Sequence, residues 1–239
     1  MELLIKELKE YIQKLENKCG NRYNLSDEYL NRLFSVYPFN KFEYVISHLI
    51  AENIISLDDY LEIRNTYVRR NKYLYLFEMA PRTFGETWGQ QHLNELAPEL
   101  DIPSRRLDQK YSGQYDFWYD GISIEVKASR AVKRQSGSSL IEKALLLNSS
   151  DGFDMNFQQL KPDCADVFVF IAVWKDAIKY WVLSREDIKT NKYFSKGQHR
   201  GNVGEGQLWI TDKNIDEFID YETKPRDLLK AIIRKSKNE

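Results

Sequence analysis

Asp116, Glu125 and Lys127 are the residues of this chain whose types and spacing are best suited to chemistry. They lie in a segment where two runs of β-prone residues flank the dipeptide Asp120-Gly121. Asp-Gly between such runs is a strong signal for a two-residue hairpin turn. With that turn, the predicted register places Asp116 directly opposite Glu125. The intervening pairs are then Tyr119 with Ile122, Trp118 with Ser123, and Phe117 with Ile124.

Two carboxylates that face each other across a hairpin call for a cation between them. Directly opposed side chains have Cβ atoms about 4.5–5.5 Å apart, and like charges there repel. Strand alternation puts Lys127 on the same face as Glu125. Closely spaced carboxylates suit Mg²⁺, which keeps several waters and bridges to a substrate phosphate. The pattern therefore favours a site that acts on a phosphodiester. The opposite face is apolar and carries Phe117, Tyr119, Ile122, Ile124 and Val126.

The alternative interpretation is that these residues are ordinary charges on an amphipathic edge strand. A Glu-x-Lys tripeptide by itself carries little weight in a chain in which 30% of the residues are charged. The functional interpretation depends on the upstream Asp116 and on the register that the turn sets.

At these residues the sequence resembles the PD-(D/E)xK nuclease superfamily, and in particular type II restriction endonucleases. Their active site combines an Asp on one strand with (D/E)-x-K on the next. Here the motif reads Tyr115-Asp116 and then Glu125-Val126-Lys127, with tyrosine in place of the usual proline.

The resemblance extends over roughly residues 78–215. Residues 84–93 are similar to the family's helix before the catalytic hairpin, which often supplies a further acid, here Glu86, with Glu95 as the alternative. Residues 157–163 and 165–174 are similar to the helix and buried strand that follow the catalytic strand. Gln158 or Gln159 would then border the site.

The resemblance implies a mixed α/β fold, with a central mixed sheet flanked by helices and an additional N-terminal helical region. It implies that Asp116, Glu125 and the backbone carbonyl of Val126 hold Mg²⁺, and that Lys127 orients or deprotonates the attacking water. Glu86 would recruit a second ion or orient the first.

The function implied is Mg²⁺-dependent, site-specific hydrolysis of double-stranded DNA in a restriction-modification system. Because palindromic targets mirror two-fold protein symmetry, a homodimer is expected, paired functionally with a cognate DNA methyltransferase. The alternatives are a non-restriction nuclease of repair or processing, a non-catalytic DNA-binding regulator, and a protein-interaction module.

Composition excludes several other classes of protein. The chain has 239 residues, of which 42% are hydrophobic, and a net charge of −1, so neither a disordered nor a membrane protein is indicated. The charged N-terminus is unlike a signal peptide, and a cytoplasmic protein is expected. Cys19 and Cys164 lie far apart and predict neither a zinc site nor a disulfide framework.

With a net charge near zero, DNA affinity must come from local basic patches. The first candidate patch follows the catalytic strand directly and contains Arg130, Lys133 and Arg134. The second is a glycine-rich stretch, residues 196–207, that is either a recognition loop or an exposed connection. Its candidate DNA-contacting residues are Lys196, Gln198, His199, Arg200 and Asn202.

The chain divides by pattern into a helical region, residues 1–75, and a mixed α/β region, residues 76–239. The first region is a scaffold, a dimerisation platform or a DNA-reading module, and we favour the first two. Four helices are expected in it. The first ends near Cys19-Gly20, and the second runs from Ser26 through Phe34. The third is capped at Asn40, and the fourth begins at Ser56. The second region predicts a helix over 84–97, a hairpin over 114–128, a helix around 153–160, strands over 165–174, 178–183 and 208–211, and a helix over 225–235.

Overall fold

The computed structural model describes residues 36–134, 137–197 and 205–237, together with isolated helical positions between residues 6 and 17. Two compact units make up the chain, Met1–Val68 and Arg69–Glu239. Apart from those isolated positions, the predicted first and second helices lie outside the described residues. In the described part of the chain, no helix has the length and apolar character needed to cross a membrane.

The described part of the first unit consists of helices. A short 3₁₀-helix, η1 (Phe39–Phe42), leads into α3 (Glu43–Ala51), and α4 (Leu57–Arg70) follows. Ser56 and Asp59 cap the start of α4 reciprocally, since the Ser56 hydroxyl accepts the Asp59 N–H and the Asp59 carboxylate accepts the Ser56 N–H. The predicted helix start at Ser56 is therefore confirmed, whereas Asn40 lies within η1 and caps nothing.

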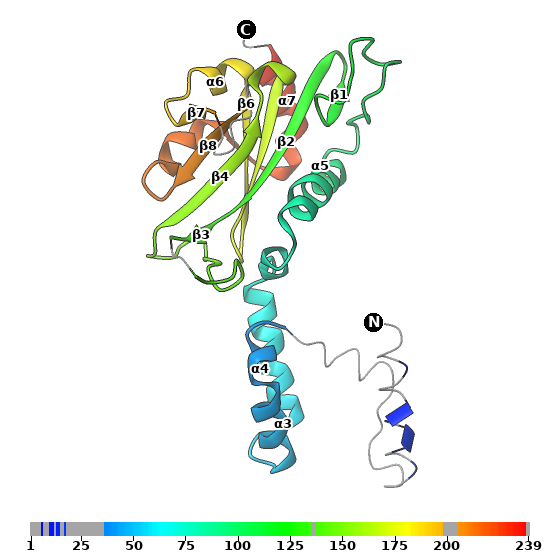
Figure 1. Ribbon diagram of the computed structural model, residues 1–239, viewed down its shortest axis with the longest axis vertical. Helices are drawn as coiled ribbons and strands as arrows, with labels where there is room; N and C mark the ends of the chain where they lie inside the picture. Colours follow the sequence, from blue (N-terminus) through cyan, green and yellow to red (C-terminus); the bar gives the residue numbers. More distant parts are fainter. Residues whose placement is uncertain are drawn as a thin grey trace. The chain divides into compact units, whose positions relative to one another are not determined.

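Two β-sheets form the centre of the second unit (Figure 1). The first sheet has the order β1-β2-β5-β6-β9 and is mixed, because β2 and β5 are parallel while the other neighbours are antiparallel. Its strands are β1 (Phe117–Tyr119), β2 (Ile122–Arg130), β5 (Val167–Val173), β6 (Ile178–Ser184) and β9 (Glu222–Thr223).

The second sheet is antiparallel and has the order β3-β4-β8-β7. Its strands are β3 (Val132–Lys133), β4 (Phe153–Leu160), β7 (Phe194–Lys196) and β8 (Gly206–Thr211). The fold class is thus mixed α/β with a mixed central sheet and helices, as the sequence predicted. The remaining helical elements are η2 (Leu74–Phe77), the π-helix η3 (Thr83–Trp88), α5 (Gly89–Leu96), η4 (Pro162–Cys164), α6 (Arg185–Lys189), η5 (Ile215–Tyr221), η6 (Pro225–Asp227) and α7 (Leu228–Ser236).

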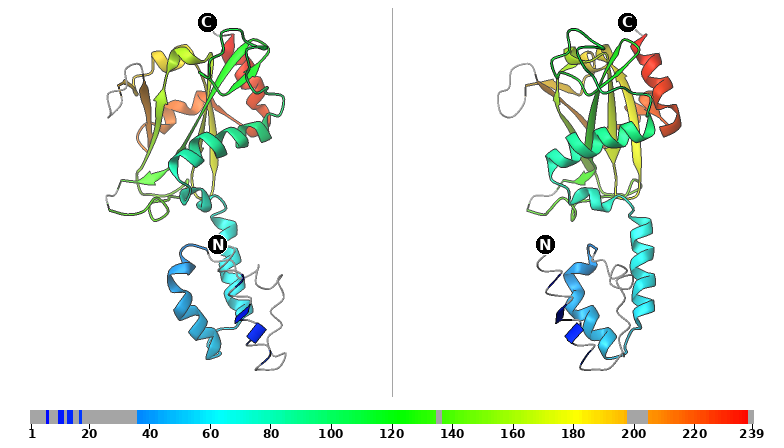
Figure 2. Two further views of the ribbon diagram at one scale, coloured as in Figure 1. Left: turned by 45° about the vertical axis from the view of Figure 1, so that its right-hand side comes forward. Right: turned by 90° about the vertical axis from the view of Figure 1, so that its right-hand side faces the viewer.

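The core lies on both faces of the mixed sheet. Every residue of β5 is buried, as its continuous apolar run predicted. On one face Phe170 of β5 meets Phe157 of β4 edge to face at 4.9 Å between ring centroids, so the two sheets pack against each other. On the other face α5 packs on β2 and α7 on β5 and β6 (Figure 2). Gly89 makes the first contact possible, because a Cβ there would lie 3.3 Å from the Cβ of Ala128.

The prediction of a helix around residues 153–160 was wrong, since this segment is the strand β4. Phe153, Met155 and Phe157 are buried and alternate with less buried polar residues, which is the two-residue period of a strand. The predicted strands over 165–174, 178–183 and 208–211 are confirmed as β5, β6 and β8. The predicted helices over 84–97 and 225–235 are confirmed as η3 with α5 and as η6 with α7.

Candidate active site

The hairpin of β1 and β2 has the register that the Asp120-Gly121 turn predicted. Phe117 pairs with Ile124, and the two pairs nearer the turn also match. Both turn residues have positive φ, 42° for Asp120 and 88° for Gly121, as a type I′ turn requires. Beyond the last strand pair, the Asp116 N–H donates to the Ile124 carbonyl at 3.0 Å. Asp116 therefore continues the hairpin and lies beside Glu125.

The three predicted catalytic residues converge at this point. The Asp116 carboxylate accepts the Val126 N–H at 2.8 Å through Oδ2, and its side chain is hydrogen-bonded to that of Glu125. Lys127 Nζ lies 2.7 Å from Glu125 Oε1. Only 12% of the Glu125 side chain and 20% of the Lys127 side chain are exposed. This is a largely shielded, partly buried carboxyl pair with one adjacent ammonium group.

Burial controls the protonation of the pair. Loss of solvent raises the pKa of Glu125 to about 7; the Lys127 cation opposes this shift, and the nearby Asp116 carboxylate reinforces it. Burial also raises the pKa of Asp116, against the lowering effect of the Val126 N–H and Lys127. Because the two carboxyls hydrogen-bond each other, the metal-free pair holds a shared proton near neutral pH.

The donor set fits a hard divalent cation such as Mg²⁺. Two carboxylates lie together, and the Val126 N–H points at Asp116. Since the N–H and C=O of one strand residue point to the same side, the Val126 carbonyl oxygen is directed toward the same place. Mg²⁺ is held by one or two carboxylates and completes its shell with water and phosphate oxygens. No cluster of three or more His, Cys, Asp or Glu side chains suited to a metal occurs among the described residues.

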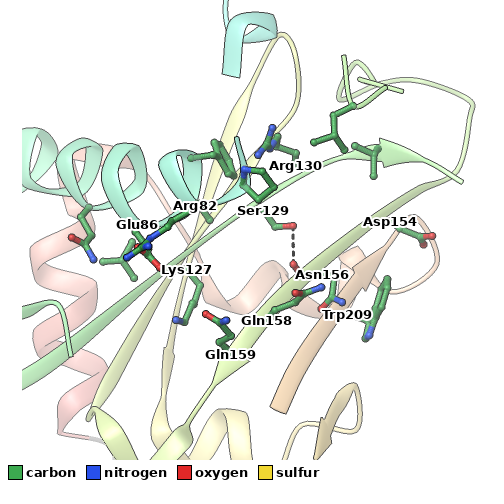
Figure 3. Close-up of a pocket in the computed structure, with 18 of the residues that line it drawn as sticks. Arg82, Glu86, Lys127, Ser129, Arg130, Asp154, Asn156, Gln158, Gln159 and Trp209 are labelled. Atoms are coloured by element: carbon green, nitrogen blue, oxygen red, sulfur yellow. Dashed lines mark hydrogen bonds and ion pairs between the residues drawn. The ribbon is translucent and has the colours of Figure 1, made fainter. Parts of the chain in front are cut away.

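These residues form part of the wall of a cleft of about 1190 Å³ (Figure 3). The residues around Arg82 to Gln90 form one side, β2 runs along the bottom, and β4 with β8 forms the other side. The Ser129 hydroxyl donates to the Asn156 carbonyl at 3.1 Å and joins β2 to β4. The polar lining comprises Arg82, Glu86, Gln90, Asp116, Glu125, Lys127, Ser129, Arg130, Lys133, Arg134, Lys143, Asp154, Asn156, Gln158 and Gln159.

The helical side of the cleft contacts the acids through Gln90, a residue that sequence reasoning missed. Gln90 Nε2 donates to Asp116 Oδ1. Glu86 lies in the cleft as expected, but its carboxylate is 2.7 Å from Arg82 Nε and 59% exposed. Glu95, the alternative, accepts a hydrogen bond from Gln91 and does not line the cleft. Helical spacing places Gln90 on the same face as Glu86, four residues earlier, but does not indicate its contact with Asp116.

The basic residues at and after the end of β2 have separate roles. Arg130, expected to contact DNA, is buried, and its Nη1 donates to the carbonyls of Leu76 and Met79 at 3.0 Å each. Its guanidinium also lies 4.1 Å from the centroid of the Phe84 ring, and burial lowers its pKa to about 10. Arg130 thus anchors the segment that precedes α5 and also lines the cleft, while its contact with DNA stays a prediction.

Lys133 and Arg134 line the cleft and are ion-paired. Lys133 lies 3.0 Å from Asp151, while Arg134 lies 2.6 Å from Asp154 and 3.1 Å from Asp212. In the second patch, Lys196 is exposed in β7. The other four candidates, Gln198, His199, Arg200 and Asn202, lie outside the described residues.

No model of a known protein family matches the chain, and no curated protein matches it.

Proposed function

We propose that this protein is a Mg²⁺-dependent, site-specific endonuclease of double-stranded DNA, with the activity of a type II restriction enzyme. The observation that carries the proposal is the convergence of Asp116, Glu125 and Lys127 in one cleft. Two carboxylates and a lysine held together and largely shielded from solvent are costly to maintain unless a cation and an anionic substrate use them.

The arrangement of the strands supports the same proposal. One acid precedes β1, the second acid and the lysine lie on β2, and the parallel neighbour β5 is wholly buried behind them. A PD-(D/E)xK core, to which the sequence motif is similar, would place its acids and lysine in this way. Membership of that superfamily is part of the proposal.

The residues of the chain have distinct tasks in this mechanism. Asp116, Glu125 and the Val126 carbonyl hold the ion, while Gln90 fixes the orientation of the Asp116 carboxylate. A Mg²⁺ ion held by these residues would supply Lewis-acid chemistry and a water of lowered pKa. The Lys127 ammonium, held 2.7 Å from Glu125, orients the attacking water and offsets negative charge that develops on the phosphate.

The wider cleft supports a large anionic substrate. Arg82, Lys133, Arg134 and Lys143 line it, and cations at such positions bind the phosphates of a DNA backbone. We also propose that the enzyme acts as a homodimer on palindromic sites and is paired with a DNA methyltransferase. The helices before residue 69 would then serve as a scaffold or a dimerisation platform.

The test is incubation of the purified protein with unmethylated plasmid or phage DNA, with Mg²⁺ or with EDTA. We expect discrete fragments with Mg²⁺ alone, none with Lys127→Ala, and the wild-type pattern with Lys213→Ala. Lys213 is exposed and does not line the cleft, so it provides a matched control for loss of a lysine.

Two other outcomes would change the proposal. Random degradation that requires Lys127 would keep the nuclease and remove site specificity. Intact DNA, from a protein that is folded and binds Mg²⁺, would overturn the proposal.

A further inference from the structure

Strand β4 contains one extra residue where it passes the catalytic lysine. Phe157 pairs with Leu208 and Leu160 pairs with Gly206, so β4 advances three residues while β8 advances two. Within this β-bulge, Gln159 has a φ of 57°. Bulges occur beside active sites, where they redirect side chains.

The bulge turns two consecutive side chains toward the cleft. Phe157 and Leu160 remain in the core at 1% and 0% exposure. Gln158 and Gln159, between them, are both exposed and line the cleft, with Lys127 across from them (Figure 3). In a regular strand, alternation would bury one of these two amides. The extra residue therefore presents two adjacent amides and leaves the core intact.

This local structure carries a conformational cost at Gln159. A positive φ is uncommon for a residue such as glutamine, and conformations of this kind persist where the surroundings enforce them, often at functional sites. Gly206 helps to enforce the bulge. A Cβ at position 206 would collide with the ring of Phe194, and a shift in the register of β8 would place a residue with a side chain at that position.

The two glutamines differ from the other polar residues on the same side of β4. Asp154 is paired with Arg134, and the Asn156 amide donates to Gln207 at 2.9 Å. Among the described residues, neither Gln158 nor Gln159 has a hydrogen-bond or ionic partner. Their amides are thus available to a ligand, whereas the Asp154 carboxylate and the Asn156 Nδ2 group are engaged within the protein and only the buried Asn156 Oδ1 lacks a partner there among the described residues.

We propose that Gln158 and Gln159 read base edges of duplex DNA beside the scissile phosphate, with adenine as the favoured base. This inference rests on the proposed nuclease function. A glutamine amide has one donor group and one acceptor, and it forms paired hydrogen bonds with N6 and N7 of adenine in the major groove. The amide is uncharged, so it is better suited to a base edge than to a phosphate. Its place beside Lys127 limits the reading to base pairs next to the cut.

The test is cleavage of a duplex library with randomised positions, followed by sequencing of the ends. The wild-type enzyme should cut at a preferred sequence that includes an A·T pair close to the cut. The Gln158→Ala/Gln159→Ala variant should still cut but lose that preference by about 10-fold or more, as expected when a paired base contact is removed. Preferences at other positions should be retained.

Two further variants make the result specific. Gln91→Ala removes an exposed glutamine that does not line the cleft and should leave every preference unchanged. Gln159→Asn keeps an amide and tolerates the positive φ but withdraws the amide by one methylene, so it should weaken the preference without loss of folding.

Three outcomes would overturn the inference. The first is an unchanged sequence preference in the double variant, which would leave the nuclease proposal intact. The second is a folded double variant that cuts no sequence, because the amides would then be needed for the reaction and not for base choice. The third is failure of the wild-type enzyme to cut or to prefer any sequence, which would also remove site-specific cleavage.

Discussion

At the scale of single residues, the carboxyl pair of Asp116 and Glu125 changes its charge with what enters the cleft. Without a cation, burial favours the neutral form and the pair holds a proton. A divalent cation needs both groups ionised, so its binding displaces that proton. The site is therefore expected to bind metal more tightly as pH rises.

The first prediction concerns the pH dependence of stability. The pKa of Glu125 rises from an ordinary 4.5 to about 7, so its neutral form contributes stability that is complete below about 4.5 and lost as pH rises through about 7. Mg²⁺ should offset this loss. The increase in Tm that Mg²⁺ causes should therefore be several degrees larger at pH 8 than at pH 6, since about 1 kcal/mol corresponds to about 2–4 °C in a chain of this size.

Thermal denaturation with and without Mg²⁺ at both pH values makes this measurement. Glu125→Gln removes the titrating group and should abolish the pH dependence. A Mg²⁺ effect of the same size at both pH values would contradict the shared-proton description of the pair.

The second prediction concerns Gln90, which donates to Asp116 and, in the proposed mechanism, would orient that carboxylate without holding the ion itself. Gln90→Ala should raise the Mg²⁺ concentration required for half-maximal cleavage by about 10-fold, a typical effect of losing a residue that orients a metal ligand. Gln91→Ala, its neighbour on the same helix, is the matched control. An unchanged Mg²⁺ requirement would show that the contact from Gln90 does not matter for the site.

At the scale of elements, the cleft depends on how β2, β4 and the segment before α5 are held together. Arg130 provides one such connection, because its buried guanidinium donates hydrogen bonds to two backbone carbonyls in the segment from η2 to η3. Its stacking on Phe84 holds η3, and η3 continues into the helix that carries Gln90.

The third prediction follows from this anchoring. Arg130→Met should lower the free energy of unfolding by about 2–3 kcal/mol, because buried carbonyls lose their charged donor. Arg134→Met, only four residues further on, should cost less than about 1 kcal/mol, since its ion pairs are partly exposed. Urea unfolding of the two variants measures the difference. Equal losses in the free energy of unfolding for the two variants would indicate that the burial of Arg130 does not determine its contribution to stability.

The fourth prediction concerns the bulge in β4. Gln159→Gly should raise the free energy of unfolding by about 0.5–1 kcal/mol, because glycine relieves the strain of a positive φ and few contacts are lost. Gln159→Ala keeps the strain and should not stabilise the protein. A loss of stability in the glycine variant would mean that the amide supports the fold, which would argue against a role reserved for a ligand.

At the scale of the whole molecule, the elements that carry the candidate site belong to one unit. All the described residues of the cleft, both sheets and helices α5 to α7 lie within Arg69–Glu239. Among the residues that the structure describes, none before Arg69 lines the cleft.

The fifth prediction is that a fragment of residues 69–239 folds alone. It should unfold cooperatively in urea and keep the Tm increase caused by Mg²⁺, because the carboxyl pair and its supports are internal to it. If the first unit provides dimerisation, the fragment should also be monomeric by sedimentation. An unfolded fragment, or one without a Mg²⁺ response, would show that the site depends on residues before position 69.

The local features of the site could be predicted from the sequence alone. The register that brings Asp116 to Glu125 follows from a two-residue turn and from strand alternation, both of which act between near neighbours in the chain. The burial of β5 and the helix over 225–235 could also be predicted, because an apolar run or a helical period indicates directly which residues are buried. Their prediction did not depend on knowing the tertiary contacts between elements.

Only the tertiary structure decided the remaining features. Gln90 meets Asp116 across 26 residues of sequence, and Arg130 reaches Leu76 across 54. Periodicity identifies the buried face of an element but not its neighbour, so neither contact could be read from the chain. The strand β4 illustrates the same limit, because its bulge interrupts the alternation at Gln158 and Gln159, and the pairing that permits the bulge comes from β8.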